Sequence, residues 1–404
     1  MTGKTPAVKE QIRIRMYRVG FGDFFLLTLP GPHQIVVDCG VHARGDIGTI
    51  GKAVEDLVQM TDKKADIVIA THAHQDHISG FGTFAAQFSA FSVKEVWMPW
   101  TENPADPDAV KLKKKQMALV DSLSQHFAAQ GGARYDAVRA VLLNLASNQA
   151  AFDLLRSGLH GAEIKYFESG QDLKNPAGIQ GLTVKVLGPP RSPQFLAQMD
   201  PPAGQRYLRL VSGKVQESNV RKPFHSRWHA RRGDKGPRLT EKEVKLLKDL
   251  AASSNEGLAF ALDQVINNTS LVTLFQYRGQ NLLFAGDAQY GNWKFWIEKE
   301  GSDQLLSQVS FYKVGHHGSV NATPKGALEK MATGKFAAML STQSTPWPSI
   351  PESKLIDALE RQADHRVVRS DALQVQGAPN VTMPVLPQGF MKGNLWFDYV
   401  IPLG

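Results

Sequence analysis

The sequence predicts a single α/β protein in which two β-sheets lie between layers of helices. Apolar runs of strand length recur in both halves of the chain, and segments with helical spacing separate them. Each half also carries a group of metal-binding residue types directly after such a run. One ligand group from each half favours two sheets within one domain, residues 1–404, over two independent domains.

Length and composition fit a soluble, cytoplasmic protein. The chain has 404 residues, 42% of them apolar and 21% charged, which is ordinary for a globular protein with a sizeable core. The polar, basic start over 1–15 lacks the apolar core of a secretory signal, and no apolar run is long enough to span a bilayer. The single cysteine, Cys39, excludes an internal disulfide and fits a reducing compartment. We expect no membrane partner.

Strand-like runs follow one another through the first hundred residues. Residues 12–16 alternate between apolar and polar, as a half-buried strand does. The runs at 24–29 and 34–38 are joined by Pro-Gly-Pro-His, which predicts a hairpin. Further strands are predicted at 66–70 and 93–98.

The segment Thr71–His77, Thr-His-Ala-His-Gln-Asp-His, follows the strand predicted at 66–70. It places three imidazoles and a carboxylate within residues 72–77. Buried without a cation, these groups would lose their hydration with little in return. Imidazole nitrogen and carboxylate oxygen bind borderline-soft divalent metals at about 2.0–2.2 Å. The expected metal ligands are His72, His74, Asp76 and His77.

Two segments look like insertions between the halves. Residues 108–158 carry apolar side chains at helical spacing, which predicts a helical insertion. A strand predicted at 182–187 ends at Gly-Pro-Pro. The segment 189–256 is then basic and rich in Pro and Gly, and it closes with a helix-like run at 241–250.

The basic segment carries the chain's excess charge. Between 206 and 238, ten Lys or Arg stand against two acidic residues, a balance of +8 that equals the net charge of the whole chain. One interpretation is a nucleic-acid-binding loop, in which Arg227, Arg231 and Arg232 contact phosphates and interleaved aromatic rings stack on bases. The alternative is a solvated insertion without a specific partner, since charge runs are common.

The second half supplies ligand types at two more strand ends. The run at 281–285 leads into Asp287, a carboxylate that could bridge two cations about 3.5–4 Å apart, although Gly-Asp also forms turns. The run at 309–314 leads into His316 and His317. Because the ligand sets reinforce one another, we expect Asp287 and at least one of the two histidines to bind metal. Further strands are predicted at 270–277, 336–340 and 395–401, and a helix at 351–359.

Asp38 closes the strand predicted at 34–38. Metal-bound imidazoles commonly donate their second N–H to such a carboxylate, which fixes the ring. We expect Asp38 to support a ligand in this way, and a turn aspartate is the alternative. Alternation along the strand points Cys39 to the other face, where a buried cysteine behaves as a small hydrophobe.

Taken together, these motifs resemble the metallo-β-lactamase superfamily. Its ComEC-like branch, the soluble domain of the bacterial DNA-uptake competence protein, is the nearer resemblance: Val19–Asp23 is similar to that branch's V-G-Q-G-D, with Phe in place of Gln. The other matching motifs are H-x-H-x-D-H at 72–77, D-x-G at 38–40, G-D at 286–287, H-H-G-S at 316–319, N-N-x-S-L-V at 267–272 and the last strand at 367–371.

The resemblance implies an αββα four-layer sandwich, the metallo-β-lactamase fold, with two divalent metal ions. His72 and His74 would bind one ion, Asp76 and His77 the second, and Asp287 would bridge them. Related phosphorylcholine esterases favour His317 as the remaining ligand of the second ion and His316 as a substrate or leaving-group contact. The other residues expected at the site are Asp23 and Asp38 behind the ligands, and Ser319 and Asn268 against the substrate.

One expected ligand is missing. Many members have a further histidine between the second and fourth motifs, but here the matching strand ends Val-Leu-Gly-Pro at 186–189. His160 is the nearest candidate, and an ordinary loop histidine is the alternative. Without a replacement, the ion held by His72 and His74 is expected to be more open and more weakly bound.

The predicted reaction is hydrolysis by a hydroxide held between two cations, with Asp76, Asp287 and His316 as catalytic groups. Zinc suits these donors, as do manganese and iron. The competence-like resemblance and the basic segment favour phosphodiesters, with nucleic acid first. Two alternatives stay open: a small-molecule phosphodiesterase, phosphorylcholine-type esterase or lactonase, and a nucleic-acid-binding module with a vestigial site. Neither G-x-S-x-G nor G-x-x-x-x-G-K-[ST] occurs to suggest other chemistry.

Overall fold

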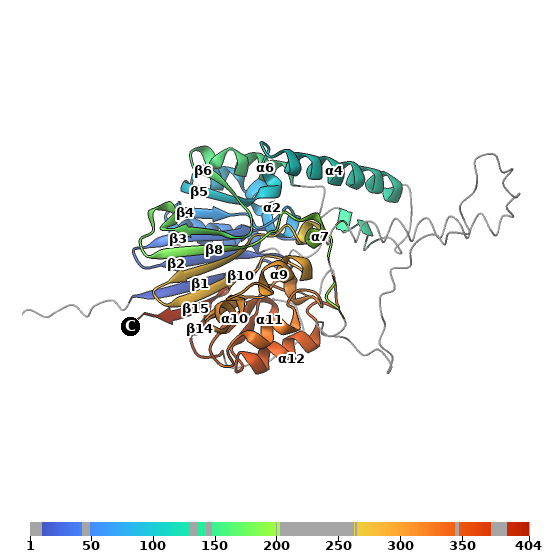
Figure 1. The fold of residues 1–404 in the computed structure, drawn as a ribbon. Coiled ribbons are helices and arrows are strands. Elements are labelled where there is room, and N and C mark those ends of the chain that lie inside the picture. Colours follow the sequence, from blue (N-terminus) through green and yellow to red (C-terminus); the bar gives the residue numbers. More distant parts are fainter. Residues whose placement is uncertain are drawn as a thin grey trace, which may run out of the picture.

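Two mixed β-sheets packed face to face form the centre of the protein, and helices cover both outer faces (Figure 1). The predicted α/β fold with an αββα arrangement is thereby confirmed. The computed structural model describes residues 10–42, 49–128, 136, 138–139, 141–142, 148–198, 200–202, 262, 265–343, 347–372 and 386–403.

The eight-stranded sheet has the order β14-β15-β1-β2-β3-β4-β5-β6. The predicted hairpin is the antiparallel pair β2–β3, whereas β3, β4, β5 and β6 are parallel neighbours. Parallel strands end at the same edge of a sheet, so residues that follow β3 and β4 come close together. The strands are β1 Gln11–Tyr17, β2 Phe24–Leu29, β3 His33–Cys39, β4 Lys64–Ile69, β5 Ser92–Pro99, β6 Glu163–Phe167, β14 Phe390–Lys392 and β15 Trp396–Pro402.

The seven-stranded sheet has the order β13-β12-β11-β10-β9-β8-β7. From β10 to β13 all neighbours are parallel, which brings the ends of β10 and β11 to one edge. The strands are β7 Gln171–Lys174, β8 Leu182–Gly188, β9 Val272–Tyr277, β10 Gln280–Phe284, β11 Phe311–Lys313, β12 Ala337–Leu340 and β13 Val367–Arg369.

Alternating side chains explain how each sheet is buried on both faces. On β2, Phe25 and Leu27 point between the sheets, and Phe24 and Leu26 point to the helices. The rings of Phe25 and Phe284 meet edge to face across the two sheets at 5.9 Å. Cys39 is fully buried in the outer layer, as predicted.

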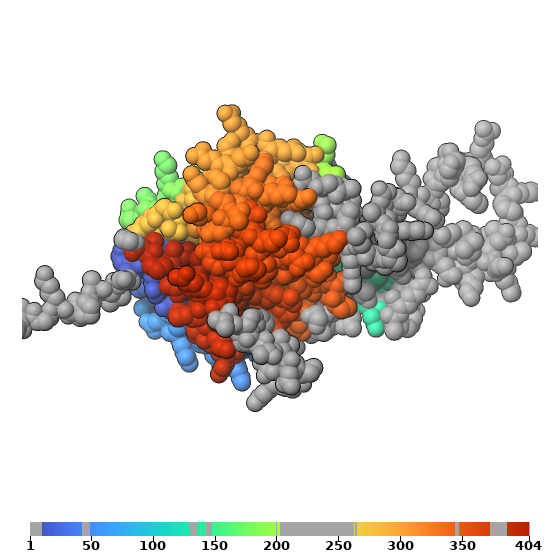
Figure 2. Space-filling model, turned by 90° about the horizontal axis from the view of Figure 1, so that it is seen from below, coloured from blue at the N-terminus to red at the C-terminus, as the bar shows by residue number. Residues whose placement is uncertain are grey.

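Helices form the two outer layers. Apolar side chains of α1 Ile50–Thr61, α2 Gln75–Thr83, α3 Ala85–Ser89 and α6 Gln149–Arg156 pack on the eight-stranded sheet. Those of α9 Tyr290–Ile297, α10 Ser302–Ser307, α11 Lys325–Lys330 and α12 Ser353–Gln362 pack on the other sheet. From below, the C-terminal third, coloured orange to red, makes up most of the visible face (Figure 2).

Only part of the helical segment at 108–158 stands apart from this sandwich. The long helix α4 Pro107–Ala128 runs along the edge of the helical layer and beyond it (Figure 1). By contrast, Phe152 and Leu155 of α6 are buried against the sheet, so α6 belongs to the fold itself. The basic stretch 206–238 lies outside the described residues. None of the described helices is long and apolar enough to cross a membrane.

Candidate metal centre

The predicted ligand motifs meet at one edge of the sandwich, where strands of both sheets end. The first motif follows β4 and enters α2, Asp287 follows β10, and His316 and His317 follow β11 in a short 3-10 turn, η7 His316–Gly318. Ligand sites of α/β proteins lie at such carboxyl ends of strands.

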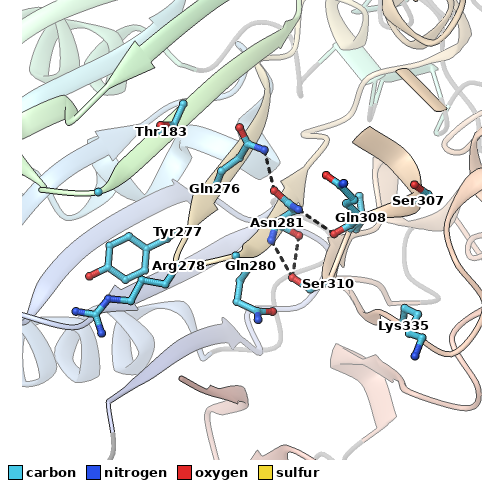
Figure 3. A pocket seen from close by; sticks show the side chains of 13 residues that line it. Thr183, Gln276, Tyr277, Arg278, Gln280, Asn281, Ser307, Gln308, Ser310 and Lys335 are labelled. Atoms are coloured by element: carbon cyan, nitrogen blue, oxygen red, sulfur yellow. Dashed lines mark hydrogen bonds between the residues drawn. The ribbon is translucent and has the colours of Figure 1, made fainter. Parts of the chain in front are cut away.

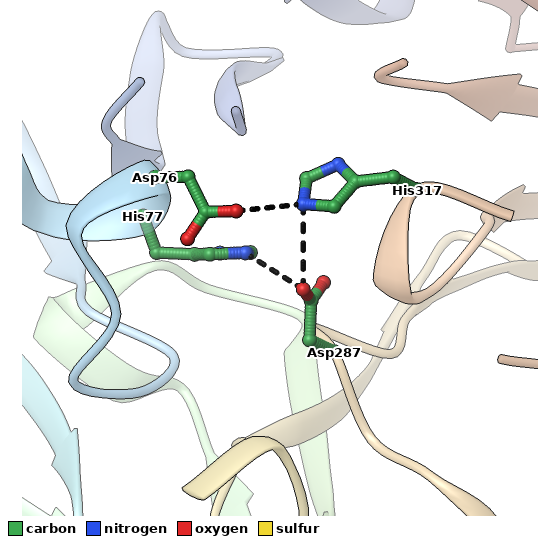
Figure 4. A group of neighbouring side chains, drawn as sticks. All are labelled: Asp76, His77, Asp287 and His317. Atoms are coloured by element: carbon green, nitrogen blue, oxygen red, sulfur yellow. Dashed lines mark hydrogen bonds and ion pairs between the residues drawn. The ribbon is translucent and has the colours of Figure 1, made fainter. Parts of the chain in front are cut away.

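Four buried side chains converge there (Figure 4). The ligand atoms of Asp76, His77, Asp287 and His317 all lie within 4.8 Å of one another. His317 Nε2 is 3.0 Å from Asp76 Oδ2 and 3.4 Å from Asp287 Oδ2, and His77 Nε2 is 3.1 Å from the same Asp287 oxygen. Ligands at 2.1 Å around a tetrahedral ion lie about 3.4 Å apart. The set therefore fits a single four-coordinate divalent cation.

The negative charge of the buried carboxylates in this cluster also favours a bound cation. Although burial disfavours the charged ring, Asp287, Asp38 and Asp23 raise the pKa of His77 well above its ordinary value. The pKa of His317 is likewise raised, against the effect of burial, by Asp287 and Asp76. Clustered carboxylates thus attract protons onto the rings in the absence of a cation, and a bound metal would replace those protons.

His72 and His74 form a pair beside this set. His72 Nε2 and His74 Nδ1 are 3.0 Å apart, and the ring centroids of His72 and His77 are 4.1 Å apart. Burial lowers the pKa of His74 to about 4 and that of His72 well below its usual value. Both rings are therefore neutral at pH 7, the form in which imidazole binds metal.

Hydrogen bonds from residues outside the cluster fix the orientation of the His77 and His317 rings. Asp38 Oδ2 accepts a hydrogen bond from His77 Nδ1 at 2.7 Å, and the N–H and hydroxyl of Thr71 both donate to the same carboxylate at 2.7 Å. His317 Nδ1 donates to the carbonyl oxygen of Ser341 at 2.9 Å. Each contact directs the ring's Nε2 at the other donors. The structure thus places Asp38 behind His77, and it adds the Ser341 carbonyl, which the sequence did not indicate.

Replacing Asp38 with asparagine should weaken metal binding by about 10–100-fold, the usual effect of removing a carboxylate that orients a ligand. Asparagine keeps the volume but loses the charge that holds His77. Competition against a chromophoric chelator would measure the change. The matched control is Asp66→Asn, since Asp66 also accepts a backbone N–H, that of Gln34, but outside the centre. Equal affinities of the two variants would contradict the role given to Asp38.

Asp287 is held by a lysine that the sequence analysis missed. Lys313 of β11 is buried, contacts Asp23, donates to the Gly286 carbonyl at 3.0 Å and lies 3.5 Å from Asp287 Oδ1. The His316 N–H donates to that oxygen at 2.9 Å. Asp23 thus lies behind Asp287, while Asp287 Oδ2 faces the rings. The available signal was a lysine inside an apolar strand, where an unpaired charge would be costly.

The His316 ring contacts different partners from His317. Its Nδ1 lies 2.7 Å from Ser319 Oγ, its Nε2 lies 3.3 Å from Asn267 Nδ2, and the residue is only half-buried. Both histidines have left-handed backbones, with φ of 45° and 51°, and such strain costs roughly 1–3 kcal/mol per residue and gathers at functional sites. The contacts of the two rings thus place His317 among the four converging donors and His316 next to them.

Two of the expected substrate contacts have other partners. Ser319 holds the His316 ring. Asn268 is fully buried: its Nδ2 donates to the Leu196 and Gln198 carbonyls at 3.1 and 2.9 Å, and its Oδ1 accepts the Gln289 N–H at 3.0 Å. An amide saturated in this way has no donor left for a substrate, so Asn268 braces the loops around the centre. The expected contacts Arg227, Arg231 and Arg232 lie outside the described residues.

His160 does not replace the missing ligand. It is exposed, and its Nε2 lies 3.1 Å from Ser89 Oγ. The strand β8 ends at Gly188, as the sequence suggests. Among the described residues, the two groups of converging ligand atoms are Asp76, His77, Asp287 and His317, and Asp23, Asp38 and His77.

A separate cavity of about 690 Å³ lies at the opposite ends of β10 and β11 (Figure 3). Asn281 crosses it, with its N–H donating to Ser310 Oγ and its Nδ2 to the Gln308 carbonyl, both at 3.0 Å. Its lining, all of it described, contains no His, Cys, Asp or Glu. The metal centre is therefore the candidate functional site.

Comparisons with known proteins agree with this fold. Residues 18–153 match the model of the metallo-beta-lactamase superfamily. The matched residues include the first ligand motif but neither Asp287 nor His317. Among curated proteins, the chain is similar to the Anti-Pycsar protein Apyc1 of Paenibacillus sp. (strain J14), with 27% identity over 125 residues. That match covers 28% of this chain and 48% of the relative, so the chain spans about half the length of that protein.

Two solved structures are also similar to the chain. One is the metallo-beta-lactamase fold protein YhfI from Bacillus subtilis, with a TM-score of 0.38 and 10% identity over 89% of this chain and 96% of that one. The other is Igni18, a metallo hydrolase from the archaeon Ignicoccus hospitalis KIN4/I, with a TM-score of 0.38 and 11% identity over 89% and 94%.

Proposed function

We propose that this chain, which has the metallo-β-lactamase fold and matches that superfamily over residues 18–153, is a metal-dependent hydrolase of phosphodiesters. The observation that carries the proposal is the convergence of Asp76, His77, Asp287 and His317, with two neutral histidines beside them. A divalent ion bound there supplies a Lewis acid and a water whose pKa falls towards about 7.

The chain's own residues prepare the site for this chemistry. Asp38 and the Ser341 carbonyl keep two rings in place before any ion arrives, and Lys313 does the same for Asp287. Preorganised groups need not rearrange during the reaction, and that is a large part of electrostatic catalysis.

We assign proton transfer at the leaving group to His316. The Ser319 hydroxyl donates its one proton to Asn321 Oδ1 at 2.7 Å, so it can only accept from His316 Nδ1. Nδ1 therefore carries the ring proton, and Nε2 keeps a lone pair. Burial lowers the pKa of His316, which favours this neutral form. His316 Nε2 can then accept a proton and return it to a departing oxygen.

Nucleic acid is the first substrate that we propose. The resemblance to the competence branch at 19–23 and 267–272 supports it, as does the basic stretch 206–238, because such charge binds phosphates. A smaller phosphodiester is the second candidate. Phe21 stands where that branch has Gln, and its ring packs 4.1 Å from the ring of His317 and 4.8 Å from that of Trp347. Phe21 and His317 are buried, so Trp347, which is only partly buried, is the ring on which a planar group of a small substrate could stack.

A substrate panel tests the choice. Protein loaded with Mn²⁺ or Zn²⁺ should cleave single- or double-stranded DNA or RNA, and neutralising Arg227, Arg231 and Arg232 should reduce that activity selectively because each lost phosphate contact weakens binding. The charge-matched control neutralises Lys111, Lys114 and Lys115 on α4. Turnover of bis(4-nitrophenyl) phosphate without cleavage of any polynucleotide would favour the small-molecule function. Inactivity on every phosphodiester by metal-loaded protein would refute the proposed function.

A further inference from the structure

We propose that the chain forms a symmetric dimer in which helix α4 packs antiparallel against α4 of a second copy. The contact surface on each copy is one exposed face of α4, made by residues 110, 114, 117, 121, 124 and 128, which we call the α4 seam. The inference goes beyond the proposed function, and its test needs neither metal nor turnover.

A different face of α4 packs on the rest of the chain. Val120 lies in a cluster with Leu262 and Ile266, and Leu123 and Phe127 are buried in a second cluster. At 3.6 residues per turn, these three side chains of α4 point away from the seam. The helix is therefore held by one face and presents the seam on another.

The α4 seam has the spacing of a helix–helix contact. Its residues follow one another at alternating intervals of four and three, as in a coiled coil. On this seam Val110 is 49% exposed and Met117 is 52% exposed. Among the residues that the structure describes, five large apolar side chains are exposed, and two of the five lie on this one helix face. Apolar side chains gathered on an exposed face indicate a contact surface.

A groove beside the seam can receive side chains of a second helix. It has a volume of about 490 Å³ and lies between α4 and the 3-10 turn η1 Trp100–Glu102. Met117 and Ala118 line it on the side of α4, and Thr101 lines it on the other side. Because α4 runs along the edge of the helical layer and beyond it, a second copy can reach this face (Figure 1).

The charges of α4 favour an antiparallel pair. Its lysines all lie in the first half, at 111, 113, 114 and 115, whereas residues 116–128 contain Asp121 and no lysine or arginine. A parallel pair would place the lysines of both copies side by side, and like charges in contact are costly. A twofold axis between Met117 and Ala118 instead brings Lys114 of each copy opposite Asp121 of the other. The pair then forms twice, and such a contact closes at two copies.

Sedimentation of the full, metal-free chain tests the dimer. We expect a monomer–dimer equilibrium with a dissociation constant in roughly the micromolar range, because small interfaces give weak, reversible association. Met117→Glu puts two like charges beside the twofold axis and should raise this constant by about 100-fold. The matched control is Met60→Glu, the same change at an exposed methionine of α1. A wild-type chain that is monomeric at about 100 μM, or a dimer that Met117→Glu leaves intact, would overturn the inference.

Exchanging the two charges tests the antiparallel arrangement. Lys114→Glu and Asp121→Lys should each weaken the dimer by roughly 10-fold, because two like-charge pairs replace two opposite-charge pairs. The double variant Lys114→Glu/Asp121→Lys should regain the wild-type dissociation constant. Lys115→Glu is the control, since it reverses a charge on another exposed face of α4. Circular dichroism checks that each variant folds. A double variant that dimerises no better than the single variants would contradict the antiparallel pairing.

Failure of this inference and failure of the proposed function are distinguishable. A chain that dimerises through the α4 seam but, when loaded with metal, hydrolyses no phosphodiester supports the dimer and refutes the proposed reaction. An active enzyme that sediments as a monomer does the reverse.

Discussion

Replacing Asp287 with asparagine should lower metal-dependent phosphodiester hydrolysis by about 10²–10³-fold, the effect typical of removing one electrostatic group from a reaction centre. Asp287 Oδ2 lies near the Nε2 atoms of both rings, 3.1 Å from that of His77 and 3.4 Å from that of His317. The amide keeps the shape but loses the charge that a cation requires. The measurement is kcat/KM on bis(4-nitrophenyl) phosphate, together with the metal content of the variant.

The control for this variant is Asp172→Asn. Asp172 is an exposed carboxylate of β7 that pairs with Lys185, far along the chain from the ligand motifs. The Asp172→Asn variant loses the same negative charge, and we expect it to keep both its activity and its bound metal. An Asp287→Asn protein that retains both its metal and wild-type activity would remove Asp287 from the centre.

The inner strands could be predicted from sequence, and most edge strands could not. β2, β3 and β10 are apolar on both faces, so the runs at 24–29, 34–38 and 281–285 stand out. The strands β6, β7 and β14 lie at sheet edges and were not predicted. Edge strands have one neighbour and carry polar residues that resist further pairing. β7, for example, reads Gln-Asp-Leu-Lys and has little apolar pattern.

The candidate ligands could be predicted because each one directly follows a strand. Their supports depend on three-dimensional structure. Ser341 acts through its carbonyl oxygen, which leaves no mark on the side-chain pattern. Lys313 reaches Asp287 because β10 and β11 pair in parallel with Phe284 opposite Lys313. The preference for His317 over His316 as a ligand came from the resemblance alone, because a side-chain pattern does not specify the left-handed backbone of the two residues.

The centre contains more buried negative than positive charge. Asp23, Asp38, Asp76 and Asp287 are all at most 3% exposed, and Lys313 is the buried lysine among them. The pKa of Lys313 is raised above its ordinary value despite burial, mainly by Asp23 and Asp287, so it is charged at neutral pH. Lys313 and a bound metal ion would therefore both neutralise the negative charge of these carboxylates. The effect of one on stability then depends on the presence of the other.

Replacing Lys313 with methionine should destabilise the metal-free protein by about 3–5 kcal/mol, the usual effect of removing one partner from a buried ion pair. Asp23 and Asp287 would keep their buried charge without their lysine. Saturating Zn²⁺ should reduce the loss, because the ion compensates Asp287. Urea unfolding with and without metal gives both free energies.

Two further variants separate charge from packing. Lys185→Met removes a partly exposed lysine that pairs with Asp172 and should cost only about 0–1 kcal/mol. The double variant Asp23→Asn/Lys313→Met should be less destabilised than Lys313→Met alone, because the uncompensated carboxylate is gone. If the double variant is the less stable one, or if zinc leaves the loss unchanged, then Lys313 acts through packing and the compensation argued for it is incorrect.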